Sequence, residues 1–471
     1  MIDSSCCLDT VLIVAATYGL EGVSRRILAR DPAACRRVDS KGKFPLYHAA
    51  SNGRAGVVGL LLSADDTVEY GDVAINGLQG DSIPLERAVC ANCPVTVQTL
   101  LDDPRVRLNL TWKPSNQQPG KEINVLDTAF ERSYWPVIKC ILDDNRWKSE
   151  LTDFQKLDLL LFSMLRGKLV QAKMLVAGIN PTARHLMGRT SLMVVLYTLG
   201  DDEEPNCEME GQYESLVREI CCHGDIDLTA TDGDGQSAVW YAANAGMRPS
   251  IMRCLVSDFG HPPDIPDNPG WTPLALCAAR GYAKGVSILL ESGQVNINSQ
   301  NNQGCTPLMA AVSKSLAGRR LESQCNDMVL LLLSKGADPH TQDIRGRTAL
   351  VYAAADGFHG SVRILLEHGA LVDPEHVNGR TALSYAAEKG YEKVTEVLLE
   401  AGADPNSCDE QGQTPYDYAA RKPSYGVYQD TGHIVEDPDG WKRAATMLKE
   451  TMSAVRKSSG TPVATTVRQE Q

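Results

Sequence analysis

Short apolar stretches alternate with polar turns along this chain, and residues 379–406 show the arrangement most clearly. They read GRTALSYAAEKGYEKVTEVLLEAGADPN. If Thr381 is position 1, then Leu383, Ala386 and Ala387 hold positions 3, 6 and 7 and share one face of a helix with 3.6 residues per turn. Thr is a good residue to cap a helix, because its hydroxyl accepts a hydrogen bond from an amide of the first turn. The pattern predicts a short helix whose buried face carries two small alanines.

A second helix is predicted within the same stretch. Gly390 is expected to end the first helix, and Val394, Val397 and Leu398 then form one buried stripe. Gly402 ends this second helix, and a link with the Asp and Gly that tight turns favour leads to the next unit. Neither helix can bury its apolar face alone. The unit is therefore expected to be stable only between neighbours of the same kind.

The pattern recurs along most of the chain. Its first position is matched at twelve anchor residues: Thr10, Phe44, Ile83, Asn124, Asp158, Thr190, Ser237, Thr272, Thr306, Thr348, Thr381 and Thr414. The intervals between them are 34, 39, 41, 34, 32, 47, 35, 34, 42, 33 and 33 residues. The spacing indicates a base period of 33–34 residues with occasional insertions, which is typical of a repeat protein.

This period and the Thr-Pro-Leu cue, as in TPLALCAARG at Thr272, resemble the ankyrin repeat family. The resemblance covers most of residues 8–457, is strongest from Ser237 to Ala420 and is loose from Cys90 to Thr198. It implies an all-α solenoid of helix–turn–helix units with protruding β-turn or hairpin loops. It also implies that partner proteins are held by the turn tips and the surfaces of the first helices, on the inner, concave side of the array.

Variation in the repeat pattern divides the chain into five segments. The 47-residue interval after Thr190 contains six acidic residues between Asp201 and Glu210. This stretch is read either as a solvated loop or as a contact for a basic partner. The expected segments are divergent repeats over 1–199, an acidic insertion loop over 200–212, well-matched repeats over 213–420, a linker and C-terminal capping helix over 421–457, and a disordered tail over 458–471.

Composition and charge narrow the function classes. Hydrophobic residues make up 43% of the 471 residues, and the formal net charge is −13. Direct nucleic-acid binding is not expected, because it needs clustered Lys and Arg. No apolar run reaches membrane-spanning length, and Asp3 and Asp9 stand where a secretory signal would carry positive charge. With fourteen dispersed cysteines interpreted as free thiols, we expect a soluble, monomeric intracellular protein of the cytoplasm or nucleus.

Motifs for catalysis or cofactor binding are not found in the sequence. Cys90 and Cys93 form a lone C-x-x-C, which is read as half-buried thiols, with a metal or redox site as the alternative. Cys221-Cys222-His223 ends a predicted helix, where His is favoured by the helix dipole and is read as a surface residue. No enzyme activity, cofactor or metal is expected. The alternative is an enzyme or enzyme subunit with its site in the divergent region 90–198.

Candidate binding residues cluster near the anchors of the well-matched repeats. Position 5 of the first helix points away from positions 3 and 7, and it is Tyr in four repeats. Tyrosine supplies large, rigid contact area, although these rings can instead only pack between helices. With residues from the turn tips and helix ends, the predicted partner-binding set is Tyr241, Trp271, Arg345, Arg347, Tyr352, Asn378, Arg380, Tyr385, Glu388, Lys389 and Tyr418.

The sequence thus predicts a non-catalytic scaffold, adaptor or regulatory protein that binds one or more partner proteins. A transcription co-regulator that acts through protein contacts is an alternative, and it fits the acidic charge equally well. A third possibility is that the chain is the repeat part of a larger signalling protein.

Overall fold

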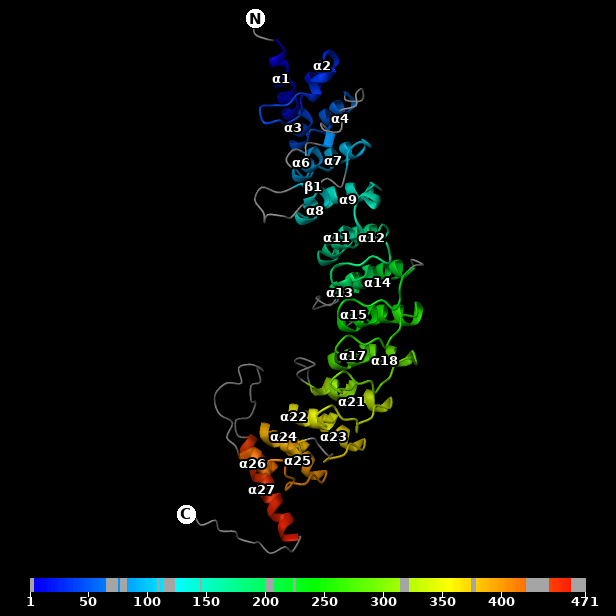
Figure 1. Cartoon of the computed structure of the whole chain (residues 1–471). Coiled ribbons are helices and arrows are strands. Elements are labelled where there is room, and N and C mark those ends of the chain that lie inside the picture. Colours follow the sequence, from blue (N-terminus) through cyan, green and yellow to red (C-terminus); the bar gives the residue numbers. More distant parts are fainter. Residues whose placement is uncertain are drawn as a thin grey trace, which may run out of the picture. The chain divides into compact units, whose positions relative to one another are not determined.

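The computed structural model describes residues 4–64, 75–76, 83–107, 111–112, 123–144, 146–199, 207–222, 226–246, 248–313, 322–373, 378–420 and 440–458. These residues form helical hairpins that belong to two compact units (Figure 1). Unit 1 contains residues 1–198 and 215–226, and unit 2 contains residues 199–214 and 227–471. The expectation of an all-α repeat fold is confirmed, with one pair of two-residue strands as the only sheet among the described residues.

Unit 1 has two layers of helices. The first helices of its hairpins are α1 (Ser4–Tyr18), α3 (Pro45–Ser51), α6 (Pro84–Cys90), α8 (Val125–Glu131), α11 (Asp153–Leu165) and α13 (Ser191–Thr198). The second helices are α2 (Glu21–Arg30), α4 (Ala55–Ala64), α7 (Pro94–Leu101), α9 (Trp135–Asp143) and α12 (Leu169–Val176). Within each layer a helix packs against the next one in sequence. The divergent region therefore continues the same hairpin stack.

Shorter elements connect these hairpins. They are the 3₁₀ turns η1 (Pro32–Arg36) and η2 (Leu186–Gly188), the helix α10 (Trp147–Glu150) and the antiparallel strands β1 (Thr111–Trp112) and β2 (Ile123–Asn124). Helix α14 (Cys207–Cys221) is shared between the two units. Residues 207–212 are thus helical, in contrast to the predicted acidic loop, and residues 200–206 lie outside the described residues.

Two weak anchors do not mark helix starts. Thr10 lies inside α1, and Asp158 lies inside α11. The start of α11 is set instead by Thr152, whose hydroxyl accepts from the Gln155 amide while the Gln155 side chain accepts from the Thr152 amide. This capping box satisfies two amides of the helix terminus at once. The helix of this repeat is therefore capped at Thr152, six residues before the anchor expected at Asp158.

Adjacent hairpins of unit 1 are joined by an arginine that reaches back to the preceding one. Arg146 Nη2 donates to the Leu101 carbonyl at 2.5 Å, and its Nη1 donates to the Val106 carbonyl at 2.9 Å. Asp144 holds the same guanidinium through Nε at 3.0 Å. In the hairpin before it, Arg105 likewise donates to the Leu62 carbonyl at 3.1 Å. The guanidinium thus satisfies carbonyls that the end of a helix leaves without a partner.

Unit 2 repeats the arrangement more regularly. Its first helices are α15 (Ala238–Ala245), α17 (Pro273–Arg280), α19 (Pro307–Ala311), α22 (Ala349–Asp356), α24 (Ala382–Lys389) and α26 (Pro415–Ala420). Its second helices are α16 (Pro249–Arg253) with the π-helical turn η4 (Cys254–Asp258), α18 (Ala283–Glu291), α21 (Glu322–Ser334), α23 (His359–Glu367) and α25 (Glu392–Glu400). Helix α27 (Gly440–Ser458) packs on α25 and α26, in the place of a last second helix.

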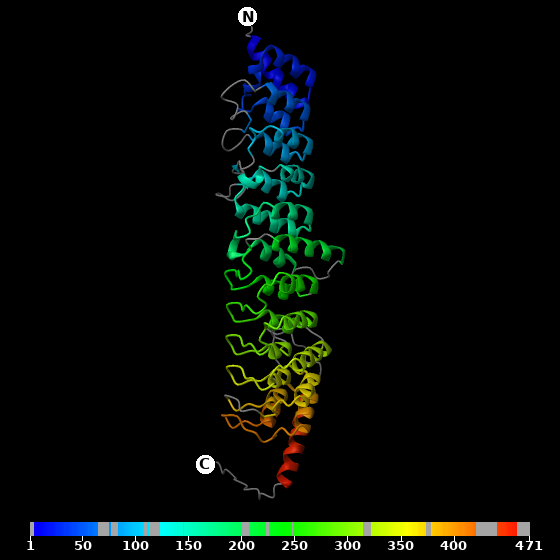
Figure 2. The same ribbon diagram turned by 90° about the vertical axis from the view of Figure 1, so that its right-hand side faces the viewer.

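The links between hairpins of unit 2 project to one side of the helices (Figure 2). Between the first helices, the paired alanines are fully buried, as Ala353, Ala354, Ala386 and Ala387 show. Small side chains allow two helices to approach closely, so these contacts form the core of the stack. No helix among the described residues is both long and apolar enough to cross a membrane.

The predicted helix ends are confirmed in most repeats of unit 2. The Ser237 and Thr272 hydroxyls accept from the Trp240 and Ala275 amides, at 3.1 and 3.3 Å. Thr348 is an exception, because its hydroxyl is buried and has no hydrogen-bond partner in the described structure. We have no physical account of this difference.

Glycines that end the first helices also make room for the next repeat. Gly357 follows α22 with φ +80°, the left-handed conformation that favours glycine. A Cβ on Gly357 would lie 2.8 Å from a ring carbon of Tyr391, which comes from the next hairpin. Gly246 and Tyr282 make the same close approach three repeats earlier. The glycine therefore serves both the turn and the packing of an aromatic ring.

Gly357→Ala is expected to lower the free energy of unfolding by about 3 kcal/mol, because it combines backbone strain with a clash against Tyr391. Gly369 is a matched control, since its φ is +86° and nothing lies within 4 Å of a Cβ built there. Gly369→Ala should cost only the backbone part, about 1 kcal/mol. Urea unfolding of both variants measures the difference. Equal losses would show that the ring contact does not constrain Gly357.

Candidate partner-binding surface

An aspartate at the start of the turn organises several links of unit 2, and Asn301 holds the same place in another. Asp343 Oδ1 accepts hydrogen bonds from the amides of Arg345, at 2.9 Å, and Arg347, at 2.8 Å. Asp232 and Asp409 make the same pair of bonds, to the amides two and four residues further on. This local pattern fixes the shape of the turn that leads into the next first helix.

The position 5 tyrosines complete this turn. Tyr241 donates its hydroxyl to Asp232 Oδ2 at 2.6 Å, Tyr352 donates to Asp343 Oδ2 at 2.9 Å, and Tyr418 donates to Asp409 Oδ2. Tyr241 and Tyr418 are only 2% and 7% exposed, so their rings pack within the repeats and offer little area to a partner. Their burial favours the packing interpretation for this pair, and a contact with a partner stays a prediction. Tyr352 and Tyr385 are half-buried.

Where position 5 is not Tyr, another side chain contacts the second carboxylate oxygen of the turn aspartate. In unit 1, His48 Nε2 lies 2.9 Å from Asp39 Oδ2. In the second repeat of unit 2, Trp240 of the preceding helix donates its Nε1 to Asp267 Oδ2 at 3.1 Å. Each of these turns therefore needs a side chain that donates a hydrogen bond to the second carboxylate oxygen of its aspartate. Without this donor the oxygen would be buried without a partner.

Arginines from successive turns lie between these rings and form what we call the Arg–Tyr ladder: Arg347, Tyr352, Arg380, Tyr385 and Tyr418. The Arg347 guanidinium lies 4.4 Å from the centre of the Tyr352 ring and donates to the Tyr352 hydroxyl at 2.5 Å. Arg380 lies between two rings, 4.0 Å from the centre of Tyr385 and 4.2 Å from that of Tyr418. Such stacking holds the guanidinium planes in fixed orientations.

Acidic side chains compensate the charge of the ladder. Arg347 Nη2 pairs with Asp343 Oδ2 at 2.8 Å, and Arg380 pairs with Glu388. Burial alone would raise the pKa of Asp343, but hydrogen bonds from the Arg347 amide, the Tyr352 hydroxyl and the Arg347 guanidinium outweigh it and lower this pKa below its ordinary value. Burial, followed by the bond with Cys305, raises the pKa of Tyr352, so its hydroxyl remains a donor.

Four of the remaining predicted binding residues lie in the same stretch of repeats as the ladder. Arg345, Asn378, Glu388 and Lys389 are exposed, and Trp271 is half-buried in an earlier turn of the same unit. These four exposed residues come from three consecutive repeats, and we call them, together with the ladder, the ladder surface. The predicted set thus separates into supporting residues, which fix the turns, and exposed residues, which are available for contact. Their role in binding stays a prediction.

The turn tips are linked to one another by main-chain hydrogen bonds, which sequence reasoning missed. The Asn268 amide donates to the Asp234 carbonyl at 2.9 Å, and the Asn302 amide donates to the Pro269 carbonyl at 3.0 Å. Ile344 donates to Gln303 in the same way, at 3.1 Å. A Cβ on Gly270 would lie 2.8 Å from the Asn302 nitrogen, so glycine is needed there for the approach. The glycine that recurs two residues before each anchor from Ser237 to Thr414 was the available signal.

The cysteine motifs form free thiols. Cys90 Sγ donates to Glu86 Oε1 at 3.0 Å, and burial together with this carboxylate raises the pKa of Cys90 to about 11. The thiol is therefore protonated near neutral pH, which disfavours nucleophilic chemistry. Cys221 is buried and Cys222 exposed, whereas His223 lies outside the described residues. No group of three or more His, Cys, Asp or Glu within the described ranges is placed to hold a metal ion.

Comparison with known families finds one match. A family model described as ankyrin repeats (3 copies) matches residues 207–301, 248–320 and 316–409. These ranges cover the residues of the ladder surface except Tyr418, which lies beyond residue 409. The recognition made from the repeat period and the Thr-Pro-Leu cue is thereby confirmed.

Individual proteins resemble shorter parts of the chain. This chain is 28% identical over 169 residues, or 36% of its own length, to neurogenic locus notch homolog protein 1 of Danio rerio. It is 33% identical over 129 residues, or 27% of its length, to BCL-6 corepressor-like protein 1 of Homo sapiens. The matched parts span 6% and 7% of these relatives. The crystal structure of the ankyrin repeat domain of Bcl-3 shares 26% identity at a TM-score of 0.40, covering 49% of this chain and 94% of that one.

Tyr352→Phe is expected to lower the free energy of unfolding by about 2 kcal/mol, because it leaves a buried carboxylate oxygen with one donor fewer. Tyr282 is a suitable control, since no hydrogen bond to its hydroxyl is formed within the described structure. Tyr282→Phe should therefore change stability by less than about 0.5 kcal/mol. Chemical denaturation compares the two, and a loss of similar size in both variants would contradict the bond's role in the turn.

Asp343→Asn should destabilise the protein most near neutral pH. A carboxyl whose folded pKa is lowered contributes stability above its unfolded pKa of about 3.9, and this contribution is lost as the pH falls through the folded pKa. The stability gap between the parent chain and the variant should therefore narrow below about pH 4. Urea unfolding from pH 7 to pH 3 measures the gap. A pH-independent gap for Asp343→Asn would contradict the lowered pKa of Asp343.

Proposed function

Because this chain is an ankyrin-repeat protein, we propose that it is a non-catalytic scaffold or regulatory adaptor that binds a partner protein on the ladder surface of unit 2. Ankyrin repeats are protein-interaction modules, which supports the general class. The ladder surface is the more specific part of the proposal. In this proposal the chain is an intracellular protein of the cytoplasm or nucleus that works as a monomer, contacting proteins and not nucleic acid.

The arrangement of Arg345, Asn378 and Lys389 beside the ladder is the observation that carries this proposal. Exposed charged and amide groups stand next to half-buried arginine and tyrosine side chains whose orientations are fixed by stacking. Preorganised aromatic and arginine side chains lose little conformational entropy on binding and are enriched among residues that dominate interface energies. A partner would therefore meet a surface that needs little reordering.

The charges on the surface indicate how it would select a partner. Glu388 is already paired with Arg380, whereas Arg345 is exposed and forms no ion pair within the described ranges, and Lys389 is exposed beside it in the surface. A partner with acidic side chains over the turn tips and a hydrogen-bonding group over Asn378 is favoured. Such charges act more on association rate and specificity than on total affinity.

Transcription co-regulation through protein contacts is the second candidate. It is favoured by the likeness of a 129-residue segment to a human protein named BCL-6 corepressor-like protein 1. The net charge of −13 suits protein contacts better than direct contacts with DNA. The identities of captured partners discriminate the two, since this candidate requires nuclear transcription proteins among them.

Reversing the charges of the exposed residues Arg345 and Lys389 tests the ladder surface. In affinity capture with quantitative mass spectrometry, Arg345→Glu combined with Lys389→Glu should reduce recovery of the direct partner about tenfold. A binding titration of the purified partner with the double variant should then show the same loss of affinity. Both positions are exposed, so the fold should be kept, and thermal unfolding checks this.

The control variant combines Arg363→Glu with Lys393→Glu. These residues are exposed on the second helices α23 and α25 and change the net charge by the same amount. It should recover the partner as the parent chain does. Equal recovery by both double variants would reject the ladder surface as the binding site.

A further inference from the structure

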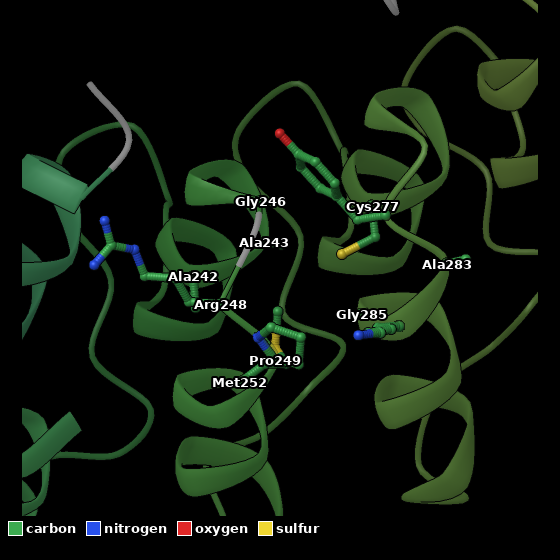
Figure 3. Close-up of a pocket in the computed structure, with 11 residues that line it drawn as sticks. Ala242, Ala243, Gly246, Arg248, Pro249, Met252, Cys277, Ala283 and Gly285 are labelled. Carbon is green, nitrogen blue, oxygen red and sulfur yellow. The ribbon is translucent and has the colours of Figure 1, made fainter. Parts of the chain in front are cut away.

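A cavity of about 280 Å³ opens between two neighbouring hairpins of unit 2, α15–α16 and α17–α18 (Figure 3). It lies at the connections between first and second helices, at the opposite end of the first helices from the turn tips and the ladder surface. Its lining residues are Ala242, Ala243, Gly246, Arg248, Pro249, Met252, Cys277, Tyr282, Ala283, Lys284 and Gly285. It is therefore a separate feature from the surface proposed above.

Small residues create this space. Gly285 occupies the place that Val394 fills in the later repeat, counted from Thr272 and Thr381. A Cβ on Gly285 would lie only 2.9 Å from Cys277 Sγ, so a larger residue here would crowd this thiol. The side wall is the ring of Tyr282, which packs directly on Gly246. The cavity thus follows from a cysteine and a glycine that replace the usual pair of side chains.

The lining chemistry favours an aromatic occupant. Met252 and Cys277 each place a sulfur atom at the cavity, and Figure 3 shows the Cys277 sulfur directed toward α15 and α16. Burial raises the pKa of Cys277 to about 12, so this thiol is neutral. Sulfur atoms make favourable contacts with aromatic rings. The volume exceeds the roughly 150 Å³ of an engineered apolar cavity that binds benzene, so a phenyl or indole ring has room.

The rim is basic. The two connecting segments, residues 244–249 and 279–284, contain Arg248, Arg280 and Lys284 and no acidic residue. Arg280 and Lys284 are exposed, and neither forms an ion pair with an acidic residue in the described part of the chain. Arg280 donates to Asn244 Oδ1 at 2.5 Å and so bridges the two hairpins at the rim. In a chain with a net charge of −13, this local cationic rim is complementary to acidic groups.

We propose that this cavity receives an aromatic side chain from a partner protein, in a segment where acidic residues flank the aromatic one. The ring fills the space between Met252, Cys277 and Tyr282, and the flanking carboxylates meet Arg280 and Lys284. The Tyr282 hydroxyl is available as a further donor. This inference goes beyond the proposed function, because it assigns a second contact at the other end of the hairpins.

The test uses the full chain and fluorescein-labelled peptides of sequence Gly-Glu-Asp-Phe-Asp-Glu-Gly. Fluorescence anisotropy should show saturable binding of this peptide. Replacing its Phe by Ala should weaken binding about tenfold, because the ring's burial is lost. Replacing its four acidic residues by Lys should weaken it at least as much, because like charges then face the rim.

Two variants of the chain locate the binding. Ala283→Phe is placed at the exposed first residue of α18 and should weaken peptide binding about tenfold by filling the cavity mouth. Lys284→Glu changes one exposed side chain and should weaken binding about fivefold. Lys393→Glu is its matched control, since Lys393 holds the same repeat position and is exposed; it should bind as the parent chain does.

Circular dichroism melting checks that each variant is folded, and Lys284→Glu keeps the test decisive if Ala283→Phe does not fold. The proposal is overturned if the Phe and Ala peptides bind equally, or if no saturable binding of the Phe peptide is seen. Loss of binding in Lys393→Glu equal to that in Lys284→Glu would also overturn it. These outcomes are independent of the ladder-surface variants.

Discussion

Close approach of neighbouring first helices is the constraint on which the other features depend. In unit 2 the distance between first helices is set by paired alanines. Ala386 and Ala387 of α24, for example, are fully buried, and α24 packs against both α22 and α26. A larger side chain there would push the hairpins apart. The turn tips would then lose the hydrogen bonds of about 3 Å that join them, and the tyrosine rings would no longer reach the glycines of the preceding repeat. Packing of the smallest side chains thus sets the geometry of the polar groups at the surface.

Much of this architecture can be predicted from the spacing of a few residue types. Helix starts at Thr272, Thr306 and Thr381 and the left-handed glycine at Gly390 follow from local rules that act within one turn. The rules fail where the local signal is absent. Asp158 was misplaced because α11 begins at a capping box that does not contain the usual Thr-Pro-Leu cue. Arg146 was missed because its carbonyl partners lie about forty residues earlier in the chain.

The positions of the candidate-site residues could be predicted from the sequence better than the roles of their side chains. The periodicity correctly places Tyr352, Tyr385 and Tyr418 on one side of successive first helices, beside Arg347 and Arg380. It does not reveal that the Tyr418 hydroxyl is bound to a turn aspartate nine residues earlier, because that depends on the three-dimensional turn. The cavity beside Cys277 depends on side chains of two hairpins together. A single sequence without structure does not show such complementarity.

The links between turn tips are made by main-chain atoms, as between Asn302 and Pro269 or Ile344 and Gln303. Main-chain amides and carbonyls are the same whichever side chain they carry, provided that proline does not remove the donor. The hydrogen bonds between the turn tips can therefore form whichever side chains the tips carry. Ile344, 68% exposed, stands where other repeats have Asn268 and Asn302. Side chains at the tips can thus be exchanged during evolution without breaking the hydrogen bonds that join the turns.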